Sequence, residues 1–148
     1  MRVVLQRVGR ASVRVEDREV AAVGRGYVLL VGIGANDAEA EVERMADKVV
    51  ASRLFADGAG KTNLAIDDVD GEVLVVPQFT LYADLGKGRR PSWTGAAAPE
   101  VAAERVEAFV RALEDRGVHV ERGVFGAHME VELLNDGPFT LILDGAGL

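Results

Sequence analysis

The sequence contains no cysteine among its 148 residues. Disulfide bonds, zinc sites with thiolate ligands and a cysteine nucleophile are therefore excluded. The absence also agrees with a reducing cytosol, because disulfide-bonded proteins belong to oxidising compartments. Any chemistry that this chain performs must come from other groups.

A long hydrophobic run is also missing. The longest uninterrupted apolar stretch, Tyr27–Val31, is far shorter than the roughly 20 residues that a membrane-spanning helix needs. Near the N-terminus, Gln6 and Arg7 interrupt the apolar residues, which is not typical of a signal peptide. We therefore expect a soluble, cytoplasmic protein that does not bind a membrane.

Positive charge is scarce, since 17 Lys and Arg residues stand against 24 Asp and Glu residues and the net charge is −7. This balance argues against a protein that coats nucleic acid, because phosphate binding draws on Lys and Arg. It still allows a small basic patch that grips only the end of an RNA. The hydrophobic fraction of 49% predicts one folded domain, residues 1–148, without extended disorder.

The common catalytic motifs are absent as well. Ser12, Ser52 and Ser92 lie outside any nucleophile motif, and no phosphate-binding loop is present. His119 and His128 are nine residues apart, which suits no standard zinc site, so we predict no metal or cofactor. We interpret His128 as a surface or packing residue rather than a base. Either the chain is not an enzyme, or backbone dipoles and the substrate itself supply the catalysis.

The hydrophobic pattern predicts many strands and two helices. Alternating or β-branched apolar residues indicate strands at residues 3–15, 20–23, 27–33, 54–55, 72–76, 118–120, 129–133 and 139–143. One helix is predicted to begin at Asn36, with Glu39 completing a capping box. The second is predicted to begin at Pro99 and end at Gly117, with an inward stripe of Ala102, Val106, Phe109, Val110 and Leu113.

These elements predict an α/β fold in which a mostly antiparallel, barrel-like sheet is covered by two helices. Residues 83–99 show little periodicity and are interpreted as a long functional loop. Residues 135–138 are interpreted as a turn between the last two strands. No internal repeat or linker divides the chain.

Two short segments stand out. Pro77–Leu81 follows a buried strand, where a proline ends regular pairing and leaves backbone N–H groups beyond it able to point at a ligand. Gly137–Pro138 is an X-Pro bond, a type that is cis in about one in twenty cases in folded proteins. On composition alone, an ordinary strand end and an ordinary trans turn are the favoured interpretations.

Together with their neighbours, these segments resemble the D-aminoacyl-tRNA deacylase family, also called D-tyrosyl-tRNA deacylases. The resemblance covers nearly the whole chain. The matching segments are Leu5–Val8, Ala11–Val13, Gly60–Lys61, Asn63–Leu64, Val73–Leu81, Arg90–Ser92, Gly123–Ala127, Met129, Asn135–Pro138 and Thr140.

The resemblance implies a homodimer that hydrolyses the ester between a D-amino acid and the terminal ribose of tRNA. Gly137–Pro138 is expected to be cis and to enter the partner's pocket, where its carbonyls exclude an L side chain. Glycyl-tRNA is left open as a further substrate. The partners implied are the tRNA acceptor end and a second copy of the chain, with the site at their interface.

The resemblance also implies roles for individual residues. Backbone N–H groups of Phe79 and Thr80 hold the carbonyl oxygen as it becomes anionic, Gln78 holds the substrate or the loop, and the ribose 2′-hydroxyl activates water. Further substrate-binding residues are Pro77, Leu81, Phe125, Ala127, Met129, Gly137 and Pro138. Candidate phosphate contacts are Arg7, Lys87, Arg89 and Arg90, for which an ordinary solvated loop is an equal alternative.

One departure affects specificity. The family begins its first motif with serine, whereas this chain has Pro77, which lacks both a hydroxyl and a backbone N–H. Proline at this place resembles a branch of the family with altered pocket selectivity, whereas Phe79 places the chain with the main branch. The alternatives to a deacylase are a non-catalytic dimeric protein that binds RNA ends and an enzyme that acts on small metabolites in the same pocket.

Overall fold

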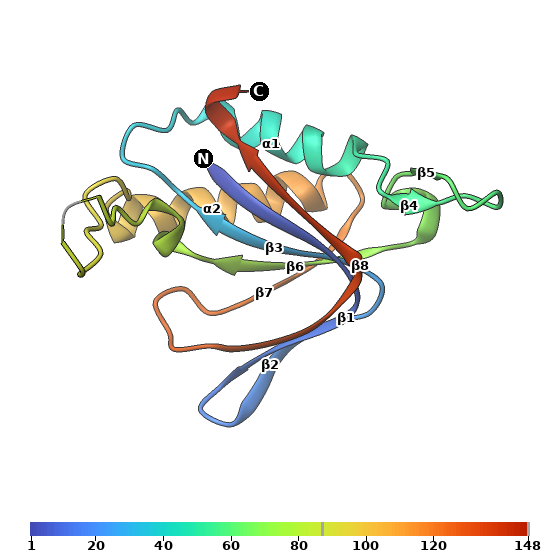
Figure 1. Cartoon of the computed structure of the whole chain (residues 1–148), viewed down its shortest axis with the longest axis horizontal. Helices are drawn as coiled ribbons and strands as arrows, with labels where there is room; N and C mark the ends of the chain where they lie inside the picture. The colour runs from blue at the N-terminus through green and yellow to red at the C-terminus, as the bar shows by residue number, and fades with distance from the viewer. Residues whose placement is uncertain (87, 148) are drawn as a thin grey trace.

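The sheet is mixed, strongly bent and nearly closed into a barrel (Figure 1). The computed structural model describes residues 1–86 and 88–147. The strand order is β2-β1-β3-β6-β7, and β8 pairs with the other edge of β1. These strands are β1 (Arg2–Val15), β2 (Arg18–Val23), β3 (Gly26–Gly32), β6 (Glu72–Pro77), β7 (His119–Arg122) and β8 (Glu130–Asp144).

The remaining elements are two helices, a small hairpin and three short 3₁₀ turns. The helices are α1 (Ala40–Ala51) and α2 (Pro99–Glu114), and the hairpin pairs β4 (Phe55–Ala56) with β5 (Thr62–Leu64). The 3₁₀ turns are η1 (Asp67–Val69), η2 (Phe79–Tyr82) and η3 (Gly145–Gly147). No helix within the described ranges is long and apolar enough to cross a membrane.

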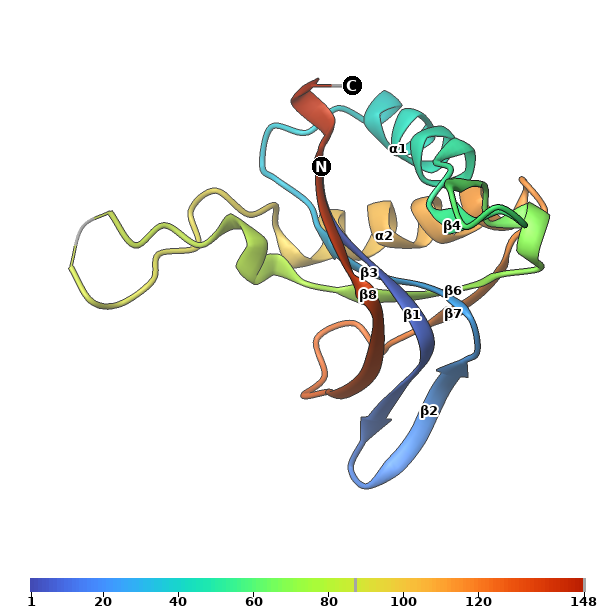
Figure 2. The same ribbon diagram turned by 45° about the vertical axis from the view of Figure 1, so that its right-hand side comes forward.

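The bend in β1 brings the sheet close to a closed barrel. Residues 2–8 pair with β3, residues 11–15 pair with β2, and β8 follows both halves of the strand. Register shifts between Gln6 and Val8 and between Val8 and Arg10 mark the bend in the β1–β8 pair. Figure 2 shows the result: the helices lie on one side of the sheet and the β1–β2 hairpin folds back on the other.

Antiparallel pairs predominate as predicted, since β1–β2, β1–β3, β1–β8 and β4–β5 are antiparallel. The sheet is nevertheless mixed, because β3–β6 and β6–β7 are parallel. Both central strands are apolar on both faces, and four consecutive residues of β6, Val73–Val76, are buried. Continuous apolar runs of this kind are typical of parallel strands, which are covered on both sides.

Two hydrophobic cores lie on opposite sides of the central strands. Along β3, Tyr27 and Leu29 face the core under the helices, whereas Val28 faces the core inside the bent sheet. This alternation follows from the two-residue period of a strand. The first core takes in the predicted inward stripe of α2, since Ala102, Val106, Phe109, Val110 and Leu113 are all buried.

The predicted start of the first helix is wrong. Helix α1 begins at Ala40, its N-cap residue is Glu39, and no side chain caps it. The predicted cap at Asn36 fails because residues 34–37 form a turn, in which the Asp37 N–H donates to the Gly34 carbonyl and the Asp37 carboxylate accepts the Gly34 N–H. By contrast, α2 begins at Pro99 as predicted.

The last two predicted strands are one continuous strand, β8, so residues 135–138 are not a turn that separates them. The neighbouring β1 holds both halves in line across its irregular register. Within β8 the Gly137–Pro138 peptide is cis, as the resemblance implied. In the described part of the predicted loop at residues 83–99, the strand-like pairings up to the start of α2 are the isolated bridges Asp84–Ser92 and Gly34–Ala96.

Glycine at the start of β3 is required by the parallel pairing. A Cβ on Gly26 would lie 1.8 Å from the backbone oxygen of Glu72, whereas a Cβ on Gly58 would meet nothing within 4 Å. We expect Gly26→Ala to lower the free energy of unfolding by about 3 kcal/mol, because backbone atoms must shift to admit the methyl group. Urea denaturation should show this loss, with Gly58→Ala unchanged within about 0.5 kcal/mol as the control. Equal stability of the two variants would contradict the interpretation.

Candidate functional site

A cavity of about 250 Å³ opens at the carboxyl end of β6. One wall is the end of β6 and the first residue of η2, and the other is the segment that joins β7 to β8. It brings together six residues predicted for the site: Pro77, Gln78, Phe79, Phe125, Ala127 and Met129. The described lining residues do not include Thr80, Leu81, Gly137 or Pro138.

His128 also lines this cavity and is exposed. The sequence interpretation set it aside as a surface or packing residue. The signal that could have identified His128 is its position between Ala127 and Met129, two residues that the family resemblance already includes. No group of three or more His, Asp or Glu residues in the described part of the chain could hold a metal ion.

The strand that leads into the cavity ends sharply at Pro77. The Gln78 N–H still donates to the Val31 carbonyl at 2.7 Å, and the chain then turns into η2. Among the described residues, the N–H groups of Phe79 and Thr80 have no hydrogen-bond acceptor. Two backbone donors are therefore left free beside the cavity, as expected where a turn begins.

The side chains of Gln78 and Thr80 bond to each other. The Gln78 amide donates to the Thr80 hydroxyl oxygen. No carboxylate or imidazole of the described residues contacts that hydroxyl. A hydroxyl needs a neighbouring base to act as a nucleophile, and the hydrogen bonds of Thr80 to the described residues include no such base.

An apolar cavity of about 350 Å³ adjoins the first one and shares Phe79, Phe125 and Gly126 with it. Trp93 forms its opposite wall and packs edge-on against Phe79, with ring centroids 5.0 Å apart. All three aromatic side chains are at least 40% exposed. Exposed aromatic rings around a hollow are typical of a binding surface. Sequence analysis missed Trp93, although it is the chain's single tryptophan and lies in the predicted functional loop.

Gly137–Pro138 is exposed, and Arg7 holds the segment around it. The Arg7 guanidinium lies 3.1 Å from the Asp136 carboxylate and 4.8 Å from the centre of the Phe139 ring, and it donates to the Leu54 carbonyl. The Asn135 amide adds bonds to the Arg7 and Phe139 carbonyls. Because the Arg7 side chain is only 14% exposed, little of it is left for the phosphate contact predicted from sequence.

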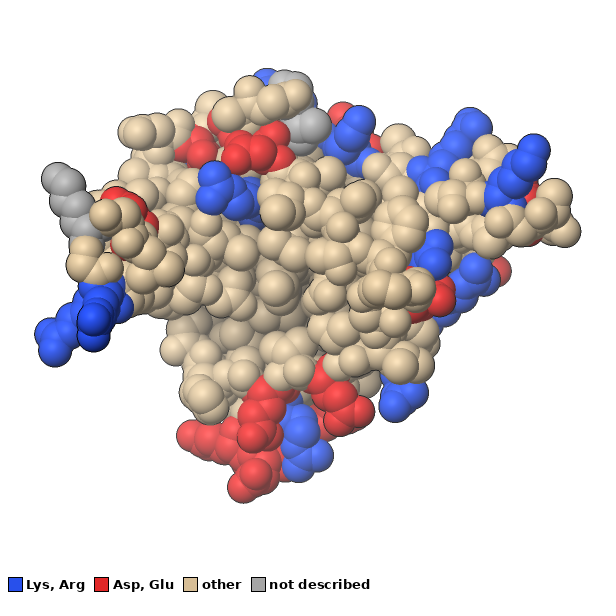
Figure 3. Space-filling model, viewed as in Figure 1, with Lys and Arg blue, Asp and Glu red and all other residues tan. Residues whose placement is uncertain are grey.

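The other predicted phosphate contacts lie in the loop before α2. Arg89 and Arg90 are exposed there, and Lys87 lies outside the described residues. Figure 3 shows basic side chains at the outer end of this loop and acidic side chains gathered at the β1–β2 end of the molecule. An anionic ligand is therefore repelled from the β1–β2 end.

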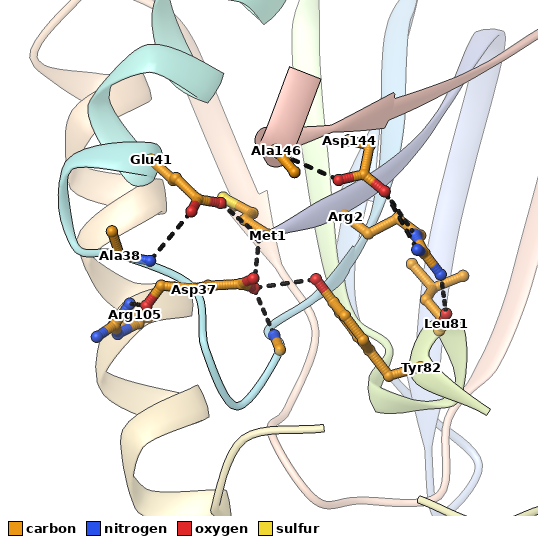
Figure 4. Close-up of polar contacts among 11 residues, drawn as sticks. Met1, Arg2, Asp37, Ala38, Glu41, Leu81, Tyr82, Arg105, Asp144 and Ala146 are labelled. Atoms are coloured by element: carbon orange, nitrogen blue, oxygen red, sulfur yellow. Dashed lines mark hydrogen bonds and ion pairs between the residues drawn. The ribbon is translucent and has the colours of Figure 1, made fainter. Parts of the chain in front are cut away.

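A polar cluster at the end of η2 shares no residue with the cavity lining (Figure 4). The Asp37 carboxylate accepts the Gly34 N–H at 2.5 Å and the Tyr82 hydroxyl at 3.0 Å. The amino group of Met1 lies 2.5 Å from Asp37 and 2.7 Å from Glu41. Burial raises the pKa of Asp37, but these hydrogen bonds and the ammonium charge outweigh it and hold the pKa below its ordinary value.

Comparisons with known proteins agree on one family. The family model described as D-Tyr-tRNA(Tyr) deacylase matches residues 4–144. A D-aminoacyl-tRNA deacylase of Roseiflexus castenholzii is 52% identical over 146 residues, which cover 99% of this chain and 93% of that protein. The corresponding protein of Thermotoga petrophila is 50% identical over 148 residues, covering 100% and 99%.

A solved structure has the same architecture. That of a c-Myc DNA unwinding element binding protein is 38% identical and superposes with a TM-score of 0.91. The match covers 97% of this chain and 98% of the other. The family resemblance inferred from sequence is confirmed.

Arg7 should stabilise the segment around Gly137–Pro138. We expect Arg7→Ala to lower the free energy of unfolding by about 2 kcal/mol, because several charge-assisted hydrogen bonds are lost from a mostly buried group. Arg10→Ala is the control, since Arg10 is on the same strand but 66% exposed and 4.0 Å from its partner Glu132. Urea denaturation measures both variants, and a loss from Arg10→Ala as large as that from Arg7→Ala would contradict this role.

Proposed function

Because the chain belongs to the D-Tyr-tRNA(Tyr) deacylase family, we propose that it hydrolyses the ester bond of D-aminoacyl-tRNA and releases the D-amino acid and tRNA. The observation that carries the proposal is the pair of unpaired N–H groups at Phe79 and Thr80, beside a cavity without a side-chain nucleophile. Such a site can stabilise an anion without a catalytic side chain. The role is proofreading in translation, in the cytoplasm where charged tRNA is used.

The reaction needs a water molecule and a place for negative charge. Water attacks the ester carbonyl, the bond to the ribose 3′-oxygen breaks, and the proton passes to that oxygen. The N–H groups of Phe79 and Thr80 stabilise the carbonyl oxygen as it becomes anionic, and each such donor contributes roughly 3–4 kcal/mol. The neighbouring 2′-hydroxyl of the substrate assists the water, as the family resemblance implies.

The aromatic cavity suits the terminal adenine of the tRNA. Unpaired RNA bases bind by stacking on aromatic side chains, and Phe79, Trp93 and Phe125 present such faces beside the proposed reaction centre. Arg89 and Arg90 then contact the phosphates of the acceptor end. With few basic contacts and a net charge of −7, binding is weak and sensitive to salt.

A second copy of the chain completes the site. Strand β8 pairs only with β1 among the described strands, so one edge of this 15-residue strand is free. Leu134 is 51% and Ile142 is 72% exposed on the same strand. A free edge with exposed apolar side chains favours association, here into a homodimer.

Gly137–Pro138 supplies the chiral selection from the partner subunit. It does not line the cavity of its own chain, and Arg7 holds its neighbours in place. Inserted into the partner's cavity, this backbone occupies the space that an L side chain needs and leaves the space of a D side chain open. Glycine has no side chain to exclude, so the same site also accepts glycyl-tRNA.

The direct test is hydrolysis of D-Tyr-tRNA and L-Tyr-tRNA at catalytic enzyme concentrations. We expect the D ester alone to be hydrolysed, and we expect Thr80→Ala to retain activity within about tenfold, because the Thr80 backbone N–H remains. An inactive but folded Thr80→Ala variant would instead support direct nucleophilic attack by the hydroxyl.

The same assay separates the alternative functions. Binding of tRNA without hydrolysis of the D ester would favour a protein that binds RNA ends. Hydrolysis of a free D-amino acid ester as fast as of D-Tyr-tRNA would favour an enzyme of small metabolites. Tighter binding to duplex DNA than to tRNA would point to the activity for which the solved neighbour is named.

Charge placed on β8 should separate the subunits. We expect the wild type to have the mass of a dimer in analytical ultracentrifugation, and Leu134→Glu/Ile142→Glu to be monomeric with deacylation at least about tenfold slower. Val20→Glu is the control, since Val20 is 42% exposed on β2. A fully active monomer would refute the shared site.

A further inference from the structure

We propose that Asp37 and Tyr82 are positioning residues for this deacylation, because they hold the turn that presents the Phe79 and Thr80 N–H groups. The inference rests on the proposed function and adds two residues that do not touch the substrate. Figure 4 shows Asp37 on the link between β3 and α1 and Tyr82 at the end of η2.

Tyr82 is fixed on three sides. Its hydroxyl donates to Asp37 at 3.0 Å, and the Arg2 guanidinium lies 5.0 Å from the centre of its ring. The ring packs directly on the backbone of Gly34, where an added Cβ would lie 2.7 Å from it. There is no room for a side chain at residue 34, so the end of η2 packs closely against the segment that follows β3.

Asp37 is itself held rigidly. Besides Tyr82, its carboxylate contacts the Gly34 N–H and the amino group of Met1, and the Arg105 side chain donates to its carbonyl. Burial and the bond to Asp37 raise the pKa of Tyr82, so the hydroxyl keeps its proton and remains a donor. The Asp37–Tyr82 bond is therefore a fixed connection between η2 and the core of the fold.

Both ends of the turn are anchored to the sheet. At its beginning the Gln78 N–H bonds to Val31 in β3, and at its end the Leu81 carbonyl accepts from Arg2 at 2.7 Å. Only one 3₁₀ turn separates Phe79 from Tyr82. A shift of Tyr82 is therefore transmitted over a single turn to the two free N–H groups.

Such precision matters for an anion-stabilising site. Donors act on the developing oxyanion only when they are placed before the reaction, and a displacement near 1 Å is costly. The turn has no strong internal fixation beyond the Gln78–Thr80 contact and its own backbone bonds. The Asp37–Tyr82 connection adds support from outside the pocket to that of the Gln78–Val31 and Arg2–Leu81 bonds.

The test compares kcat and KM for D-Tyr-tRNA in Tyr82→Phe, Asp37→Asn and Glu41→Gln. Glu41 is the matched control, because it contacts the same Met1 amino group but not Tyr82. We expect Tyr82→Phe and Asp37→Asn to lower kcat about tenfold with KM little changed. Glu41→Gln should keep kcat within about twofold, since a stability effect alone does not slow a folded enzyme.

Two further readouts separate positioning from general stability. The double variant Asp37→Asn/Tyr82→Phe should be no slower than the slower single variant, because both remove one connection. The amide resonances of Phe79 and Thr80 should move in Tyr82→Phe and stay in place in Glu41→Gln. If Tyr82→Phe does not fold, Asp37→Asn carries the same comparisons.

The outcomes distinguish this inference from the proposed function. An inactive wild type overturns the deacylase proposal and this inference with it. An active wild type with unchanged kcat in Tyr82→Phe and Asp37→Asn overturns the positioning role alone. An equal loss of kcat in Glu41→Gln also overturns it, since the effect would then come from the Met1 contacts.

Discussion

The end of the parallel β3–β6 pairing is the constraint on which the site depends. Up to Pro77 the backbone of β6 pairs with β3, and the last hydrogen bond between them runs from the Gln78 N–H to the Val31 carbonyl. Beyond that bond the chain turns, and two N–H groups are left without partners among the described residues. Because the buried central sheet is rigid, it fixes the positions of these two N–H donors.

A site built on backbone donors needs support from elsewhere. The cavity has no metal cluster in the described residues and no activated nucleophile. The charged groups instead lie outside the cavity lining: Asp37 bonds to Tyr82 at the end of η2, and Arg7 pairs with Asp136 beside Gly137–Pro138 in β8. Both residues hold the protein chain rather than the substrate, so these electrostatic interactions stabilise the geometry of the site.

Local patterns predicted most elements, whereas contacts distant in sequence decided the rest. The α2 stripe and the strand before Pro77 follow from periodicity and were confirmed. The predicted cap at Asn36 was wrong because the neighbouring Asp37 holds this segment in a turn through Gly34 and through Tyr82, 45 residues away. The bonds of Arg7 to Leu54 and Asp136 could not be predicted, since no local pattern reveals contacts between residues so distant in sequence.

The departure from the family's serine at Pro77 is accommodated by the same constraint. The β6–β7 pairing ends at Val75 and Arg122, so Pro77 lies beyond the last residue that needs a donor towards β7. The missing N–H therefore removes no ladder bond, and the following Gln78–Val31 bond is intact. What changes is the cavity wall, which presents a ring in place of a hydroxyl. Pro77 thus changes the surface that the cavity presents to a ligand, while the Gln78–Val31 bond still holds the turn that carries the free N–H groups.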